Sequence, residues 1–157
     1  MHDDLRKQAD LVGFNEEQGN FLLLSYGAED TGLILSAVGG PHSVDTMISI
    51  LTFCSVPQPE NTISALVDQV LKPGGELIFF EHVQSRREDV VWWQRFWSPI
   101  WGMAFDGCVI GRPTDAIIEG LNVWEEKEIT RLEEGEDTED LFVHSIGRLT
   151  KNSAVSM

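Results

Sequence analysis

His82 is the residue of this sequence whose position best suits proton transfer. It follows Glu81 at the end of an apolar run over residues 77–80, which predicts a strand. Histidine titrates near neutrality, so its imidazole could take a proton from a thiol, a hydroxyl or an amine. Asp106 lies in a later loop and could orient His82 or a substrate. A strand-end histidine can also simply cap a loop, and the sequence alone leaves both interpretations open.

The two cysteines, Cys54 and Cys108, are the other reactive groups. They do not form a Cys-x-x-Cys pair, and the four histidines lack the spacing of zinc ligands, so we expect no metal site. The simplest interpretation is a pair of buried thiols in a protein of a reducing compartment. A reactive role for Cys108 is the alternative.

Aromatic residues concentrate in one stretch, with four of the five tryptophans at positions 92, 93, 97 and 101. Trp93, Trp97 and Trp101 are four residues apart and share one face of a helical segment over 88–101, which Pro99 interrupts. Such a face can cover an apolar substrate, contact a membrane surface or pack on a sheet. The positive charges nearby are Arg86, Arg87 and Arg95. They are too few to favour strong binding to an anionic membrane surface. We expect this aromatic segment to pack partly in the core and partly as a lid over the substrate, with Trp93 and Trp97 touching the substrate.

The elements that position these side chains centre on residues 44–82, which predict a strand, a helix, a turn and a second strand. Residues 44–51 are largely apolar, as a strand covered on both faces must be. The helix that follows has one apolar stripe, formed by Ile63, Leu66, Val67, Val70 and Leu71. Lys72 lies in its last turn, where a cation suits the helix dipole, and Pro73 with Gly74 ends it. The unit predicts a right-handed crossover between two parallel strands.

The flanking segments complete an α/β pattern that ends in an antiparallel hairpin. Helices are expected over residues 2–12 and 113–121, a short helix or an irregular segment over residues 28–38, and strands over residues 21–25, 123–132 and 141–150. The last two strands are joined by the acidic residues 133–140 and should therefore pair with each other. We expect one domain over residues 1–151 and a disordered tail over residues 152–157.

Ligands of open α/β sheets bind beyond the carboxyl ends of the strands. The loops in which we expect a site are therefore residues 27–30, 52–56 and 81–85.

The net charge of −15 over 157 residues argues against nucleic acid as a partner, because phosphates require clusters of Lys and Arg. Nine acidic residues fall within residues 125–140, as expected of a solvated hairpin tip. The chain opens with Met1-His2-Asp3-Asp4, which is no signal peptide, and no run approaches the roughly 18 apolar residues of a membrane span. These features predict a cytoplasmic protein without stable membrane insertion.

Five short motifs follow one another in a distinctive order. They are Thr52-Phe53-Cys54-Ser55-Val56, Leu71-Lys72-Pro73-Gly74-Gly75, Glu81-His82-Val83, Trp93-Gln94 and Asp106-Gly107-Cys108. In this order they resemble the second half of a class I S-adenosylmethionine (SAM)-dependent methyltransferase. The nearest branch is similar to the methyltransferase-like thiol methyltransferases and their fungal natural-product relatives, and the resemblance covers roughly residues 1–151. It implies a Rossmann-like sheet with the strand order 3-2-1-4-5-7-6.

The resemblance also implies SAM as the cofactor. Gly27, Ala28 and Glu29 would touch its adenine end, where Ala28 leaves room and Glu29 accepts a hydrogen bond from the exocyclic amine. Thr52 and Phe53 would line the methyl-donor side. The implied substrate is a small apolar molecule of secondary metabolism with a thiol, hydroxyl or amine acceptor. It would contact Cys54, Trp93, Trp97 and Cys108.

The sequence departs from the family pattern at the cofactor loop. Class I methyltransferases open with a strand and a Gly-x-Gly-x-Gly loop, followed by a strand ending in an acidic residue that holds the ribose; this sequence has neither. We therefore expect a truncated domain, an incomplete sheet, and weak or absent SAM binding. The edge of the strand over 44–51 would be exposed unless residues 21–25 pair with it or a second chain completes the sheet.

Two other functions fit the same residues. One is a catalytically inactive remnant that binds a partner through its open sheet edge. The other is a lyase or cyclase that reuses the pocket without the cofactor.

Overall fold

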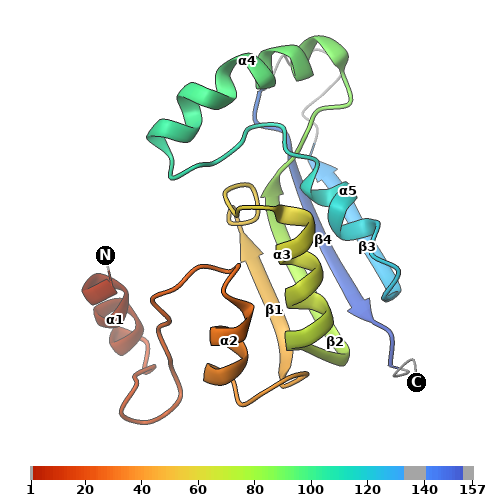
Figure 1. Cartoon of the computed structure of the whole chain (residues 1–157). Helices are drawn as coiled ribbons and strands as arrows, with labels where there is room; N and C mark the ends of the chain where they lie inside the picture. Colours follow the sequence, from red (N-terminus) through yellow and green to blue (C-terminus); the bar gives the residue numbers. More distant parts are fainter. Residues whose placement is uncertain (1, 133–140, 154–157) are drawn as a thin grey trace.

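The computed structural model describes residues 2–132 and 141–153. Within this part of the chain, four strands form one open sheet in the order β1-β2-β4-β3 (Figure 1). The strands are β1 (Val44–Ile50), β2 (Leu71–His82), β3 (Trp124–Leu132) and β4 (His144–Lys151). β1 and β2 are parallel, and β4 is antiparallel to both of its neighbours. The parallel unit, the terminal hairpin and the 4-5-7-6 part of the expected strand order are thereby confirmed.

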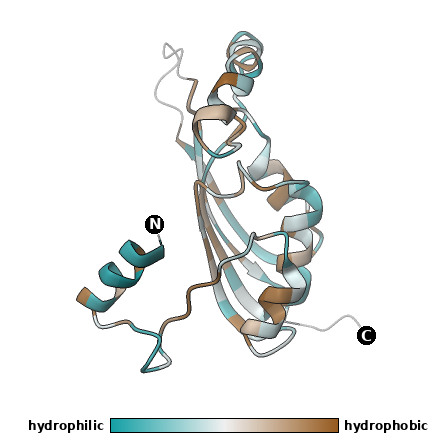
Figure 2. Cartoon of the chain, turned by 60° about the vertical axis from the view of Figure 1, so that its left-hand side comes forward, coloured by the Kyte–Doolittle hydropathy of each residue, from teal (hydrophilic) through white to brown (hydrophobic). Residues whose placement is uncertain are grey.

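Some of the described helices cover one face of this sheet, and the others lie beside or beyond it (Figure 1 and Figure 2). The helices are α1 (His2–Leu11), α2 (Thr31–Ala37), α3 (Pro59–Ala65), the π-helical turn η1 (Leu66–Val70), α4 (Glu88–Ala104) and α5 (Thr114–Glu119). Figure 2 shows α2, α3 and α5 on one side of the sheet, whereas the hydrophilic α1 stands apart from it. On the other face Ile48 and Ile50 remain 64% exposed. No helix in the described ranges has the length and apolar character needed to cross a bilayer.

The core lies between the sheet and the α3–η1 and α5 helices. Burial alternates along β2, so that Leu77, Phe79 and Glu81 face the helices while the residues between them face the open side. Gly147 of β4 lies directly opposite Phe79 and makes room for its ring. The side chains with at most 1% exposure are led by Ile63, Val67, Leu71, Leu77, Phe79, Ile118 and Leu149.

The helix before β2 differs from the expectation in two respects. The predicted apolar stripe is buried, but the helix widens to a π turn over η1 and ends at Val70. Lys72 does not serve the helix end, since it pairs with Asp45 of β1. Lys151 of β4 takes that place, because its Nζ donates hydrogen bonds to the carbonyl oxygens of residues 67, 68 and 71 at 2.8–3.1 Å.

Three further expectations need correction or fall outside the described residues. Residues 21–25 form no strand, because an extended segment becomes one only when a neighbour completes its hydrogen bonds. Pro99 does not interrupt α4, whose peripheral position tolerates one missing backbone hydrogen bond. The acidic connection 133–140 and the tail beyond Ser153 are not described, while Asn152 still donates its N–H to the carbonyl of Val123 at 2.8 Å.

Candidate functional site

Three loops meet beyond the carboxyl ends of β1 and β2, beneath α4 (Figure 1). They are the turn after β1, the segment that leads from β2 into α4, and the return from α4 to α5. The backbone ties them together, since the N–H of Val109 donates to the carbonyl of Cys54 at 3.0 Å and the N–H of Gln84 donates to that of Arg112 at 3.1 Å. These loops include residues 52–56 and 81–85, in which the sequence predicted a site.

Glu81 organises the turn after β1. Its side chain is fully buried, and its Oε1 accepts hydrogen bonds from the Ser49 hydroxyl at 2.6 Å and from the N–H groups of Thr52 and Phe53 at 3.0 and 3.1 Å. Its Oε2 accepts from the N–H of Cys54 at 3.3 Å. Our sequence reasoning assigned no role to Glu81. The sequence could have indicated its burial, however, because side chains alternate strictly along β2 and this alternation places the carboxylate on the core side.

Cys54, His82 and Cys108 converge from the three loops. The two Sγ atoms are 3.2 Å apart, and the Sγ of Cys108 is 3.6 Å from the Nδ1 of His82. Burial and the hydrogen bond with Cys108 raise the pKa of the Cys54 thiol to about 12. Both cysteines are buried and free, as the sequence predicted, but nothing in the linear spacing indicated that they would face each other.

His82 lies in aromatic surroundings. Its ring is 4.7 Å from that of His144 and 5.6 Å from that of Phe142, centroid to centroid. Burial, and next the neighbouring His144, lower the pKa of His82, and the Glu81 carboxylate opposes them only in part. The imidazole is therefore neutral at pH 7 and can accept a proton.

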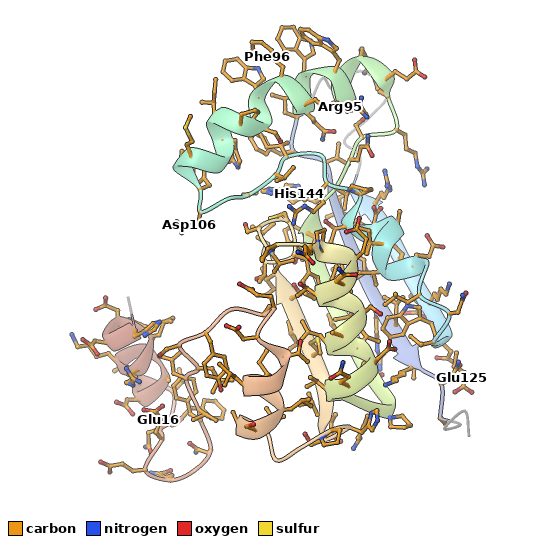
Figure 3. The ribbon with its side chains drawn as sticks, in the orientation of Figure 1. Glu16, Arg95, Phe96, Asp106, Glu125 and His144 are labelled. Carbon is orange, nitrogen blue, oxygen red and sulfur yellow. The ribbon has the colours of Figure 1, made fainter. Side chains whose placement is uncertain are left out.

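The structure does not bring Asp106 to His82. Asp106 is exposed in a left-handed turn (φ 46°) that follows α4, and Figure 3 shows it apart from His144, the neighbour of His82. No hydrogen bond or ion pair of Asp106 with His82 occurs in the described part of the chain. An orienting role for Asp106 has no support from this geometry, because an exposed carboxylate without contact to the imidazole cannot fix its position.

Residues 27–29 form a closed turn at the amino end of α2. The carboxylate of Glu29 folds back so far that a Cβ on Gly27 would lie 2.3 Å from its Oε2. The N–H of Gly27 donates to the carboxylate of Asp30 at 3.3 Å, and Ala28 packs against the core. The turn lies near the carboxyl end of β1 (Figure 1), and the N–H of Asp30 donates back to the carbonyl of Gly27 at 3.1 Å.

Thr52 and Phe53 serve the turn after β1. Their N–H groups are taken up by Glu81, and the Phe53 side chain is part of the hydrophobic core. The Arg112 guanidinium donates from NH1 to the carbonyl oxygens of Phe53 and Val56 at 3.0 and 2.6 Å. Phe53 is thus a core residue, the alternative that burial of an aromatic ring at a strand end favours.

An apolar cavity of about 360 Å³ lies under the second half of α4. Its lining is Trp97, Ile100, Trp101, Ala104, Ile110, Leu141 and Phe142. Phe142 connects the cavity with the thiol–imidazole cluster, since its ring contacts both His82 and Trp101. Trp97, one of the two tryptophans expected to touch a substrate, thus lines this cavity, and its contact with a substrate stays a prediction.

Trp93 does not line this cavity. It contacts Trp92 and Phe96 in an exposed aromatic cluster along the outer face of α4, where Figure 3 shows Phe96 pointing away from the sheet. The residue that attaches α4 to the sheet is the buried Gln94. Its Oε1 accepts the N–H of Ser85 at 3.0 Å, and its Nε2 donates to the carbonyls of Val83 and Leu141 at 3.2 and 3.0 Å.

Comparison with known proteins finds related sequences for half of the chain. The thiol S-methyltransferase TMT1B of Rattus norvegicus is 40% identical over 78 residues, 49% of this chain and 32% of that protein. Thiol S-methyltransferase TMT1A of Homo sapiens is 38% identical over 80 residues, again 49% of this chain and 32% of that protein. The matched region thus spans about a third of these curated relatives. No family model matches the sequence.

Solved structures share the fold over nearly the whole chain. An O-methyltransferase family protein from Burkholderia thailandensis superposes with a TM-score of 0.61 at 12% identity, covering 98% of this chain and 42% of that one. A SAM-dependent methyltransferase from Thermotoga maritima, described as a possible histamine N-methyltransferase, gives a TM-score of 0.54 at 19% identity, covering 93% and 70%. The fold is that of the class I methyltransferases, as the sequence motifs indicated.

Proposed function

We propose that this chain, which has the class I methyltransferase fold, is the acceptor-binding part of a SAM-dependent methyltransferase that acts on a small apolar thiol. The apolar cavity beside His82 is the observation that carries the proposal. It is lined by aromatic and aliphatic side chains, one of which, Phe142, also contacts the ring of His82. Among the thiol, hydroxyl and amine acceptors, the thiol is favoured by the 40% identity with a thiol S-methyltransferase.

The chemistry of the acceptor side follows from these residues. Trp97 and Trp101 remove the apolar body of the acceptor from water, which orients its reactive end. His82 accepts the thiol proton on a ring nitrogen, which is free to do so because burial lowers the pKa of the imidazole and leaves the ring unprotonated. Glu81 keeps the turn after β1 in place beside the reacting group.

The donor side is incomplete in the residues described. Bound SAM would supply the electrophilic methyl group, but Gly27 and Glu29 close on each other and the N–H groups of Thr52 and Phe53 are occupied by Glu81. No Gly-x-Gly-x-Gly loop occurs in the sequence to let the backbone approach a nucleotide. These residues do not fit the whole cofactor, so we derive no methyl-transfer step from them.

Titration with benzyl mercaptan, an apolar thiol, tests the acceptor site. We expect saturable quenching of tryptophan fluorescence in the wild-type chain and binding weaker by about tenfold or more in Trp97→Ala. Trp92→Ala is the matched control, since Trp92 lies on the same helix outside the cavity and should leave the affinity unchanged. Non-saturable quenching, or equal losses in both variants, would overturn the acceptor site.

Calorimetry with S-adenosylhomocysteine tests the donor side separately. We expect binding at least about a hundredfold weaker than to a full-length thiol methyltransferase, since lost partners of the nucleotide amount to roughly 3 kcal/mol. If the chain bound S-adenosylhomocysteine as tightly as the full-length protein does, the interpretation of an incomplete donor site would be wrong. The proposal of the acceptor site would not be affected.

We also propose a cytoplasmic location. Cys54 and Cys108 are both free although their sulfur atoms are 3.2 Å apart, a state that a reducing compartment maintains. Because both thiols are buried, alkylation under denaturing conditions at the moment of lysis, followed by mass measurement, should find both modified. A disulfide under these conditions would refute this location.

A further inference from the structure

Three side chains with metal-binding atoms meet beneath α4, although they come from separate loops. The Sγ of Cys54, the Sγ of Cys108 and a ring nitrogen of His82 all lie within 4.8 Å of one another. The shortest separations are 3.2 Å between the sulfur atoms and 3.6 Å between the Sγ of Cys108 and the Nδ1 of His82. A single ion placed among them could contact all three.

We propose that Cys54, His82 and Cys108 bind a divalent zinc ion. In a tetrahedral zinc site, bond lengths of about 2.3 Å to sulfur and 2.0 Å to nitrogen place two sulfur atoms about 3.8 Å apart and sulfur and nitrogen about 3.5 Å apart. The Cys108–His82 pair already has this separation. The two sulfur atoms need to move apart by about 0.6 Å, a shift that side-chain rotation provides.

The charge of this ligand set suits a buried site. Cys54 and Cys108 are only 1% and 5% exposed. On binding, each thiol gives its proton to the solvent, and two thiolates with one neutral imidazole then balance the double charge of the ion. Two thiolates without the ion would leave uncompensated charge in the same place, so the site requires either the protons or a cation.

The surroundings hold two of the ligands in place. Glu81 accepts the N–H of Cys54 at 3.3 Å and thereby fixes the turn that carries the first sulfur. The N–H of Cys108 donates to the carbonyl of Phe105 at 2.9 Å, which fixes the turn that carries the second. The His82 ring is confined between His144 and Phe142.

Three protein ligands leave a fourth position for water or substrate, as in catalytic zinc sites. The cavity under α4 is adjacent, since Phe142 lines it and contacts His82, and Ile110 lines it two residues after Cys108. We assign this position to the acceptor sulfur, an assignment that depends on the proposed function. With zinc bound, the lone pair of the His82 imidazole would be committed to the metal, so coordination would take the place of His82 in holding that sulfur as a thiolate at neutral pH.

Cobalt titration of the reduced, metal-free chain tests the site. We expect one Co²⁺ per chain, with the near-ultraviolet sulfur-to-cobalt charge-transfer band and the intense visible bands of a tetrahedral thiolate site, and displacement by Zn²⁺. Zinc should release two protons per ion in weakly buffered wild-type solution, a readout that depends on no variant. Absence of the thiolate bands, or loss of both thiols to a disulfide when Co²⁺ is added under reducing conditions, would overturn the site.

Variants identify the ligands. We expect zinc binding to weaken at least about a hundredfold in each of Cys54→Ser, Cys108→Ser and His82→Gln. Mutations of residues that only support metal ligands cost up to about a hundredfold, so loss of a ligand itself should cost at least as much. His144→Gln is the matched control, because His144 packs against His82 but is not among the three converging ligand atoms. A loss in His144→Gln with no loss in His82→Gln would overturn the assignment.

Benzyl mercaptan added to the cobalt-loaded chain tests the fourth position. A shift of the charge-transfer band indicates that the acceptor sulfur binds the metal. An unchanged band, although fluorescence shows the thiol in the cavity, would overturn this assignment and leave the proposed acceptor site intact.

Discussion

The carboxylate of Glu81 accepts a hydrogen bond of 2.6 Å from the Ser49 hydroxyl, across the two parallel strands of the sheet. The same carboxylate takes up three consecutive backbone N–H groups, so four donors converge on one fully buried acid. This arrangement joins the strand ends to the turn that presents Cys54. The shape of the candidate site therefore depends on Glu81 more than on any residue that touches the cavity.

Replacing Glu81 by Gln should lower the free energy of unfolding by about 2–3 kcal/mol, because the new amide directs N–H groups toward backbone N–H donors. Denaturant unfolding measures the change. Glu76→Gln on the same strand is the control: Glu76 pairs with Arg148 at the surface, and its loss should cost about 1 kcal/mol or less. Equal losses in the two variants would contradict the role given to Glu81.

Gly147→Ala should lower the free energy of unfolding by about 1–3 kcal/mol, since the added Cβ would lie 2.4 Å from the Phe79 ring in the packed core. Gly32→Ala is the opposite case. Gly32 lies within α2 with no atom near its Cβ position, so Ala should stabilise the helix by about 0.5–1 kcal/mol. Thermal unfolding of both variants checks the two signs.

Asp115→Ala should lower the free energy of unfolding by about 3–5 kcal/mol, because it breaks a largely buried ion pair. The pair joins α5 to β3 at 2.6 Å, with side-chain exposures of 6% for Asp115 and 17% for Arg131. Asp89→Ala removes an exposed pair with Arg87 of similar length and should cost about 1 kcal/mol or less. A small effect of Asp115→Ala in denaturant unfolding would argue against a strong buried pair.

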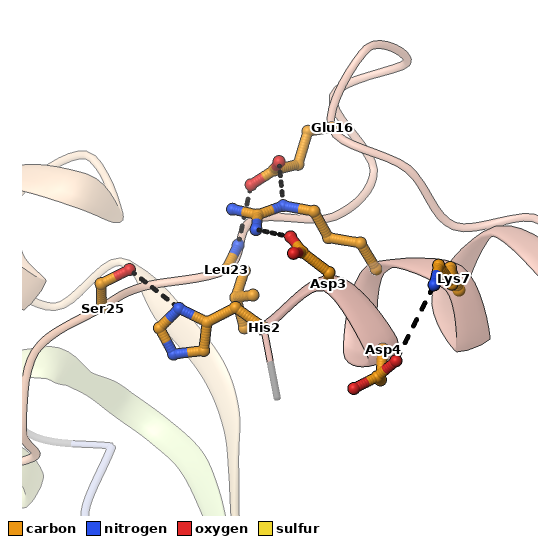
Figure 4. A network of polar contacts seen from close by, with 8 residues as sticks. His2, Asp3, Asp4, Lys7, Glu16, Leu23 and Ser25 are labelled. Atoms are coloured by element: carbon orange, nitrogen blue, oxygen red, sulfur yellow. Dashed lines mark hydrogen bonds and ion pairs between the residues drawn. The ribbon is translucent and has the colours of Figure 1, made fainter.

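Acid should loosen the N-terminal segment through Glu16. The hydrogen bond from Arg6, and next the one from the N–H of Leu23, hold the pKa of Glu16 below its ordinary value of 4.5 (Figure 4). A lowered folded pKa means that the stabilisation is complete above pH 4.5 and is lost as the pH falls through the lowered value. Hydrogen exchange at the Leu23 amide should accelerate over this range relative to other amides, and Glu16→Gln should abolish that pH dependence.

The expectation that a second chain completes the sheet remains a prediction. Among the described strands, β1 pairs only with β2 and has one charged residue, Asp45, whereas β3 at the opposite edge has three Glu, one Lys and one Arg. We expect a solution mass above that of one 17.6 kDa chain and its reduction in Ile48→Lys on the edge strand. Ile146→Lys changes the same open face away from that edge, so a similar effect there would indicate association through the face instead.

The sequence predicted most elements because their signals are local. The apolar stripe before β2, the apolar run ending at Glu81 and the hairpin on either side of the acidic stretch each follow from side-chain periodicity. Residues 21–25 were wrongly predicted as a strand for the same reason. A strand also needs a neighbour, and periodicity says nothing about one.

The sequence by itself determined the α/β class and the presence of two free thiols and a strand-end histidine, whereas a ligand site beyond the strand ends stays a prediction. Only the tertiary structure decided that Cys54, His82 and Cys108 face one another and that Glu81, not Asp106, organises the loops around them. The physical reason is distance along the chain. The three ligand residues are separated by more than twenty positions each, and only the register of β1 on β2 and the packing of the α4 loops bring them within contact.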